Sequence, residues 1–89
     1  MNGFIENYMY GIVTETKNIV SDNIKDSSGE PRKGVLVFKK KSDAVYECEE
    51  LNYTRQKMKL PQVYSVSKLS ENDLIDIDII LDGEWKPYV

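Results

Sequence analysis

The stretch Val35-Leu36-Val37-Phe38-Lys39-Lys40-Lys41-Ser42-Asp43-Ala44 decides the fold of this chain. It opens with the longest unbroken apolar run in the sequence, and the β-branched and aromatic residues of that run predict a strand over 35–39. Ser42 is a good helix N-cap, so we expect a helix from about residue 43 to about residue 56. Apolar residues then continue along one face of this helix, at Ala44, Cys48, Leu51 and Met58.

Strand signals lie on both sides of this unit. Residues 8–15 are rich in aromatic and β-branched types, and residues 63–69 carry the same signal after the helix. Between the first two strands, residues 16–34 are polar and contain several turn formers. This segment indicates a long loop or a ragged hairpin connection, with room for a short extra strand around 18–24.

The C-terminal part begins with a capping signal. Ser70 and Asp73 have the Ser-x-x-acid spacing of a capping box, which predicts a single helical turn at 71–74. The apolar and acidic residues that follow alternate with a period of two, which predicts a strand over 75–81.

The whole chain, residues 1–89, is expected to be a single domain, because 89 residues support one modest hydrophobic core. The expected order is β-β-α-β followed by a short C-terminal element. This order predicts an α+β fold in which one helix packs on one face of a small antiparallel sheet. A polar loop at about 16–34 and a short C-terminal tail at 83–89 complete the expected organisation.

The composition favours a binding protein over an enzyme. The chain has no histidine and one cysteine, so it lacks the commonest general base and zinc ligand and has no internal disulfide. No phosphate-binding, metal-binding or nucleophile motif is present, and no apolar run approaches the roughly 20 residues of a membrane helix. We therefore expect a cytoplasmic protein with no cofactor, no resident metal, no catalytic activity and no membrane contact.

Aromatic and acidic residues supply a candidate surface for another protein. Trp85 and Tyr88 lie in the tail and Tyr8 lies near the N-terminus, and such side chains give large contact area at low entropy cost. Asp76 and Asp78 are two positions apart and are expected to share one face of a strand. These five residues predict a protein-binding regulator or inhibitor, and a second copy of the chain is one partner that the sequence leaves open.

A nucleic-acid-binding module is the alternative. The middle of the chain, residues 31–69, is basic between acidic ends, although the whole chain has a pI of about 4.9. Lysine and arginine neutralise phosphates, and tyrosines nearby on the helix could stack on bases. The residues that would bind phosphate are Arg32, Lys33, Lys39, Lys40 and Lys41.

One resemblance covers residues 35–69. Lys41-Ser42-Asp43-Ala44 opens the helix, Glu49-Glu50-Leu51-Asn52 continues it, and Tyr64-Ser65-Val66 begins the next strand. This strand–helix–strand pattern resembles small uncharacterised accessory proteins of phages and low-GC bacteria. The resemblance implies an accessory or host-modulating role and no particular activity.

Overall fold

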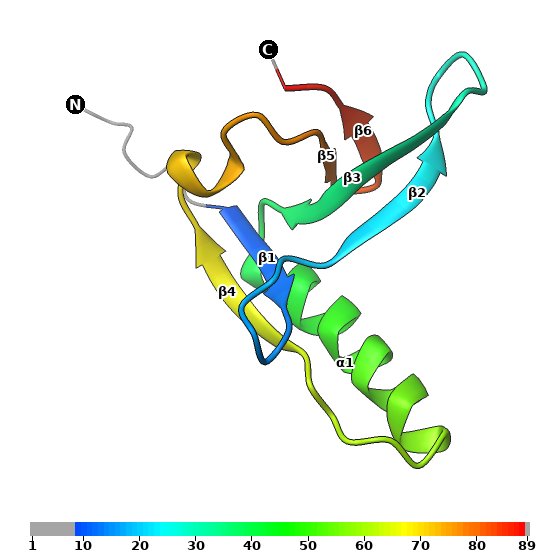
Figure 1. Ribbon diagram of the computed structural model, residues 1–89, viewed down its shortest axis with the longest axis vertical. Coiled ribbons are helices and arrows are strands. Elements are labelled where there is room, and N and C mark those ends of the chain that lie inside the picture. The colour runs from blue at the N-terminus through cyan, green and yellow to red at the C-terminus, as the bar shows by residue number, and fades with distance from the viewer. Residues whose placement is uncertain (1–8, 89) are drawn as a thin grey trace.

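The computed structural model describes residues 9–88. One helix and one sheet form the domain, so the predicted α+β class is confirmed (Figure 1). Tyr8, one of the predicted partner-binding residues, lies outside the described residues. The elements in chain order are β1 (Met9–Val13), β2 (Ser21–Lys25), β3 (Pro31–Phe38), α1 (Lys41–Lys57), β4 (Ser65–Leu69), the 3₁₀ turn η2 (Glu71–Leu74), β5 (Ile79–Leu81) and β6 (Glu84–Lys86).

The strands form one mixed sheet in the order β4-β1-β3-β5-β6, with β2 paired to β3. β1 is antiparallel to both of its neighbours, but β3 and β5 run parallel, with Val35 opposite Ile79. The prediction of an antiparallel sheet is therefore wrong at this pair. The reason is the connection after β4, which crosses to the far side of β3, since a crossover brings the chain back in the same direction.

The segment predicted as a polar loop at 16–34 is a hairpin over most of its length. β2 pairs with the first half of β3, from Ser21 opposite Val35 to Lys25 opposite Pro31, and it is the short strand for which the sequence left room. Asp26 organises the turn between the two strands. Its Oδ1 accepts hydrogen bonds from the backbone N–H groups of Ser28 (2.9 Å) and Glu30 (3.0 Å). Side-chain acceptors of this kind satisfy turn N–H groups and stabilise the hairpin.

Asp26 also joins this hairpin to the C-terminal strand. Its Oδ2 accepts a hydrogen bond from Arg32 Nε at 2.9 Å, and the Arg32 guanidinium lies 4.8 Å from the centroid of the Trp85 ring.

The hydroxyl of Ser28 also donates to Asp26 Oδ1, and hydrogen bonds from Ser28 and Arg32 hold the pKa of Asp26 well below its usual range. The ionised form of Asp26 is therefore the one that the folded hairpin prefers.

The hairpin is expected to loosen only in strong acid. Because the pKa of Asp26 is lowered in the folded chain, its contribution to stability is fully present above the unfolded value of about 3.9 and is lost as the pH falls through the lower folded value. The amide chemical shifts of Ser28 and Glu30 should therefore stay constant from pH 7 to about pH 4 and change below that. Asp26→Asn should remove this pH dependence, and a change that begins near pH 6 would contradict the assignment.

The helix α1 is slightly longer than the expected 43–56. Ala44 and Cys48 are buried and Leu51 is half-buried, so the predicted apolar stripe is confirmed up to Leu51. Met58 is exposed, because the helix ends at Lys57 and the chain turns away. The stripe therefore packs the first three turns of the helix onto the sheet.

Polar side chains fasten the end of α1 to the segment before β4. The Asn52 amide donates to the Tyr64 carbonyl oxygen (3.0 Å) and accepts from the Tyr64 N–H (3.1 Å), so both backbone groups of Tyr64 are satisfied. Arg55 Nε donates to the carbonyl oxygen of Pro61 at 2.6 Å. These contacts fix the return of the chain from the helix to the edge of the sheet.

The tail expected at 83–89 contains the strand β6. Asp82 and Gly83 form a two-residue turn with φ of 49° and 90°, the positive values that a type I′ hairpin needs. This turn places Ile80 of β5 opposite Trp85 of β6. An Asp-Gly pair between strand-forming residues is a strong hairpin signal that could have predicted β6.

The helix α1 packs on one face of the sheet, against β1, β4 and β3. Figure 1 is viewed down the shortest axis, 21 Å in extent, and shows the start of α1 behind β1. The buried residues of the core are Ile12, Val13, Val37, Ala44, Cys48, Leu69 and Ile80.

In the part of the chain that the structure describes, no helix has the length and apolar character to cross a membrane.

Candidate functional site

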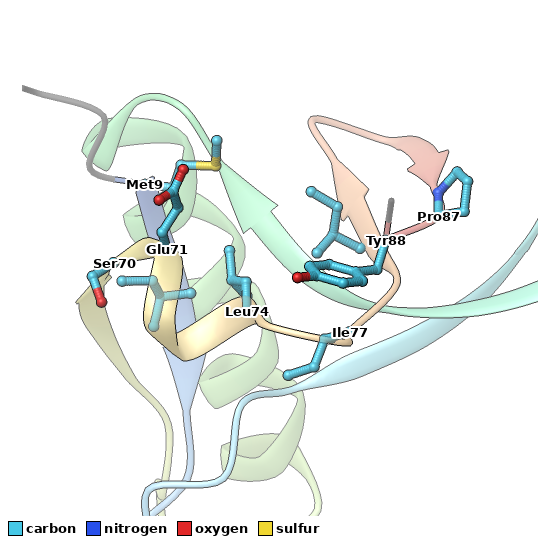
Figure 2. A pocket seen from close by; sticks show the side chains of 9 residues that line it. Met9, Ser70, Glu71, Leu74, Ile77, Pro87 and Tyr88 are labelled. Atoms are coloured by element: carbon cyan, nitrogen blue, oxygen red, sulfur yellow. The ribbon is translucent and has the colours of Figure 1, made fainter. Parts of the chain in front are cut away.

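An apolar groove lies where the ends of four strands meet η2 (Figure 2). Its volume is about 340 Å³, and Figure 2 shows it in front of β1, with α1 on the far side of the sheet. Most of the lining side chains are apolar or aromatic, so an occupant would be held mainly by burial of apolar surface. The lining residues are Met9, Leu69, Ser70, Glu71, Leu74, Ile77, Ile79, Pro87 and Tyr88.

The turn η2 forms one wall of the groove. Asp73 Oδ2 accepts hydrogen bonds from the backbone N–H (2.7 Å) and the hydroxyl (3.1 Å) of Ser70. In the other direction, the backbone N–H of Asp73 donates to the Ser70 carbonyl oxygen at 3.1 Å. These contacts between Ser70 and Asp73 explain why the predicted turn at 71–74 forms. The turn directs Leu74 into the groove, while the next residue, Ile75, is exposed and does not line it (Figure 2).

The segment after β6 forms the opposite wall. The backbone N–H of Tyr88 donates to Asp78 Oδ1 at 2.9 Å, which fixes the position of the segment. Figure 2 shows the ring of Tyr88 extending toward Leu74, and 48% of the residue remains exposed. Two of the predicted partner-binding residues are therefore brought together: Tyr88 lines the groove, and Asp78 positions it.

Asp76 and Asp78 do not share the face of a strand. β5 begins only at Ile79, and Asp76 has a φ of 61°, a left-handed conformation that aspartate tolerates better than β-branched residues do. The strand predicted over 75–81 is therefore wrong for its first four positions. Ile77, which lies between the two aspartates, lines the groove instead.

Trp85 lies outside the groove, within its own sheet. Its Nε1–H donates to the carbonyl oxygen of Lys33 at 3.2 Å, and one face of its ring receives the guanidinium of Arg32. The residue is half-buried. Its hydrogen-bonding group and much of its surface are therefore used inside the domain, which leaves Tyr88 as the more accessible aromatic anchor.

The five predicted phosphate-binding residues are spread along β3 and beyond it. Arg32 is engaged by Asp26. Lys33 lies six positions before Lys39, a span of about 20 Å at roughly 3.3 Å per extended residue. Lys39, Lys40 and Lys41 are exposed at the junction between β3 and α1. The structure therefore places the basic residues in two groups, one near each end of β3.

Cys48 is buried on the inner face of α1. Burial raises the pKa of the Cys48 thiol, and the nearby Glu49 carboxylate adds to the shift. The thiol therefore stays protonated at neutral pH and is a poor nucleophile. Within residues 9–88, no group of three or more histidine, cysteine, aspartate or glutamate side chains is placed to hold a metal ion.

Comparison of the chain with family models, with curated proteins and with solved structures finds no match.

Proposed function

We propose that this chain is a small binding protein without catalytic activity, a regulator or inhibitor that holds an apolar segment of a partner protein in the groove. The observation that carries the proposal is the apolar groove with the half-exposed Tyr88 on its wall. Aromatic residues beside well-packed pockets are typical hot spots of protein interfaces. The hydrogen bond from Tyr88 N–H to Asp78 holds this aromatic anchor in place before a partner arrives.

The chemistry of the walls favours a protein segment over a polar metabolite. Small-molecule sites orient their ligands with several convergent polar groups. Among the residues that line this groove, Ser70, Glu71 and Tyr88 carry polar side-chain groups, and the Ser70 hydroxyl already binds Asp73. The volume of about 340 Å³ is at the small end of ligand pockets. An apolar side chain projecting from a partner needs no orienting groups and fits these walls.

Leu74→Glu is expected to weaken partner binding strongly, because it introduces a carboxylate that would lose its water in the apolar groove. A partner captured from the source cells by the wild-type chain would be purified, and its Kd measured by calorimetry. Leu74→Glu and Tyr88→Ala should each weaken binding by about 30-fold or more, which corresponds to roughly 2 kcal/mol.

The matched control is Ile75→Glu, which puts the same charge on the adjacent residue, 50% exposed and outside the groove. This variant should bind like the wild type, and circular dichroism should show that all three variants are folded. A folded Leu74→Glu variant that retains wild-type affinity would rule out the groove as the binding site.

The same binding measurements distinguish a partner in the groove from the nucleic-acid alternative. The triple change of Lys39, Lys40 and Lys41 to alanine should leave protein binding intact if the groove is the site. Binding that survives Leu74→Glu, is lost in the lysine triple and falls steeply between about 50 and 200 mM salt would instead indicate phosphate contacts.

A further inference from the structure

The outward face of α1 carries two exposed tyrosines. Tyr46 and Tyr53 are seven residues apart, so at 3.6 residues per turn they share one face of the helix, and this face is opposite the buried Ala44 and Cys48. Tyr46 is 66% exposed and Tyr53 is 57% exposed. Tyrosine is enriched at protein interfaces, because it supplies large contact area with few rotatable bonds. Both rings are therefore accessible for contact with a partner.

The surroundings of these tyrosines are acidic. From Ser42 to Thr54 the helix has four acidic residues and no basic one. In the part of the chain that the structure describes, none of the four forms an ion pair. This half of the helix therefore presents four carboxylates without ion pairs near the two rings, and the cation that lies close to a ring is Lys57, over Tyr53. The four residues are Asp43, Glu47, Glu49 and Glu50.

Each tyrosine borders a shallow depression lined by carboxylates. The depression beside Tyr46 has a volume of about 280 Å³, and the one beside Tyr53 has a volume of about 370 Å³. No lysine or arginine belongs to the residues that line either of them. Each depression thus offers an aromatic ring next to negative charge. The carboxylates are those of Asp43, Glu47 and Asp82 in the first and of Glu49 and Glu50 in the second.

Arginine is the side chain that matches this pairing of ring and carboxylate. Its planar guanidinium stacks on aromatic faces and donates paired hydrogen bonds to carboxylates. The chain already shows that the Tyr53 ring accepts a cation, because Lys57 Nζ lies 5.6 Å from its centroid. We propose that the outward face of α1 binds an arginine-rich segment of a partner protein, with one arginine on Tyr46 and another on Tyr53.

The spacing of the tyrosines sets the spacing of the arginines. Seven residues along a helix span about 10 Å, and an extended segment covers the same distance in about three residues. This surface is separate from the groove, because Figure 2 shows the groove in front of β1 and α1 behind the sheet. The proposal therefore does not depend on the proposed function of the groove.

The test uses a synthetic ten-residue peptide with arginine at every third position and Gly-Ser pairs between the arginines. In NMR titrations of the ¹⁵N-labelled chain, the peptide should shift the amide signals of Tyr46, Glu50 and Tyr53. The double variant Tyr46→Ala, Tyr53→Ala should raise the Kd at least tenfold, and the double variant Tyr46→Phe, Tyr53→Phe should restore binding by keeping the rings. Glu49→Gln with Glu50→Gln should also weaken binding, and this loss should shrink at high salt.

The matched control is Tyr88→Ala, which removes an exposed tyrosine from the groove and leaves α1 unchanged. It should bind the peptide like the wild type even if it loses the partner of the groove, so failure of one proposal is distinguishable from failure of the other. Peptide shifts centred away from α1 would overturn the inference. Equal affinity of the alanine double variant, with a folded spectrum, would also overturn it, as would equal binding of a peptide with glutamate in place of arginine.

Discussion

Replacing Ile12 by alanine is expected to lower the free energy of unfolding by about 2–5 kcal/mol, the range for large-to-small changes in protein cores. Ile12 is fully buried in β1, and β1 lies between β4 and β3 and also contacts α1. Because β3, β4 and α1 surround this position, their side chains should not move in to fill the cavity that the alanine leaves. Since small domains have total stabilities on the order of 5–15 kcal/mol, this loss should be plain in urea unfolding followed by circular dichroism.

Ile75→Ala is the matched control, because it removes the same atoms from a half-exposed position in the connection between η2 and β5. Its effect should stay within about 0.5 kcal/mol. Similar losses for the two isoleucines would mean that β1 is not the centre of the core.

The β3–α1–β4 unit was predictable from sequence because each of its parts obeys a local rule. The apolar run at Val35–Phe38 indicates a strand, and the spacing of Ala44 and Cys48 fixes the buried face of the helix. The predicted cap is wrong by two residues, because the helix begins at Lys41 after Lys40, and Ser42 lies within its first turn. Ser70 and Asp73 predicted η2 for the same reason, since a capping box acts within one turn.

The parallel pairing of β3 with β5 was not predictable in this way. It depends on contacts between distant segments, and the alternating pattern at 75–81 carried no information about strand direction. The pattern also overstated the strand, because Asp76 adopts a left-handed conformation and Asp78 accepts a hydrogen bond from the tail. The alternating residues before β5 therefore form a turn, at Asp76, and a side-chain hydrogen bond, at Asp78, and do not form a strand.

The groove was predictable only in part. Tyr88 was recognisable as an aromatic residue near the chain end, but Met9, Leu74 and Ile77 have no property that separates them from ordinary core residues. They become a site because the strand order brings the ends of β1, β4 and β5 beside the tail. Trp85 shows the reverse case, since its indole N–H donates to Lys33, 52 positions away, a contact that no local pattern indicates.

The second large effect is expected for Gly34→Ala, which should lower the free energy of unfolding by about 1–3 kcal/mol, the usual cost of overpacking. A Cβ atom at Gly34 would lie 2.9 Å from the carbonyl carbon of Ile79 and 3.1 Å from the carbonyl oxygen of Asp78. Both atoms belong to the backbone at the start of β5, so no side-chain rotation relieves the clash. Gly34 thus permits the close approach of β5 to β3, and amide exchange of Val35, whose N–H donates to the Asp78 carbonyl, should speed up in the variant.

Gly11→Ala supplies the comparison within the same sheet. A Cβ atom there would lie 2.6 Å from Leu69 Cδ1, which is the end of a flexible side chain, and no closer than 3.4 Å to the backbone oxygen of Leu36. Because Leu69 can move and the backbone of β5 cannot, Gly11→Ala should cost less than Gly34→Ala in the same urea experiment. The reverse ranking, or unchanged exchange of the Val35 amide in Gly34→Ala, would show that β5 does not approach β3 as closely as its parallel pairing requires.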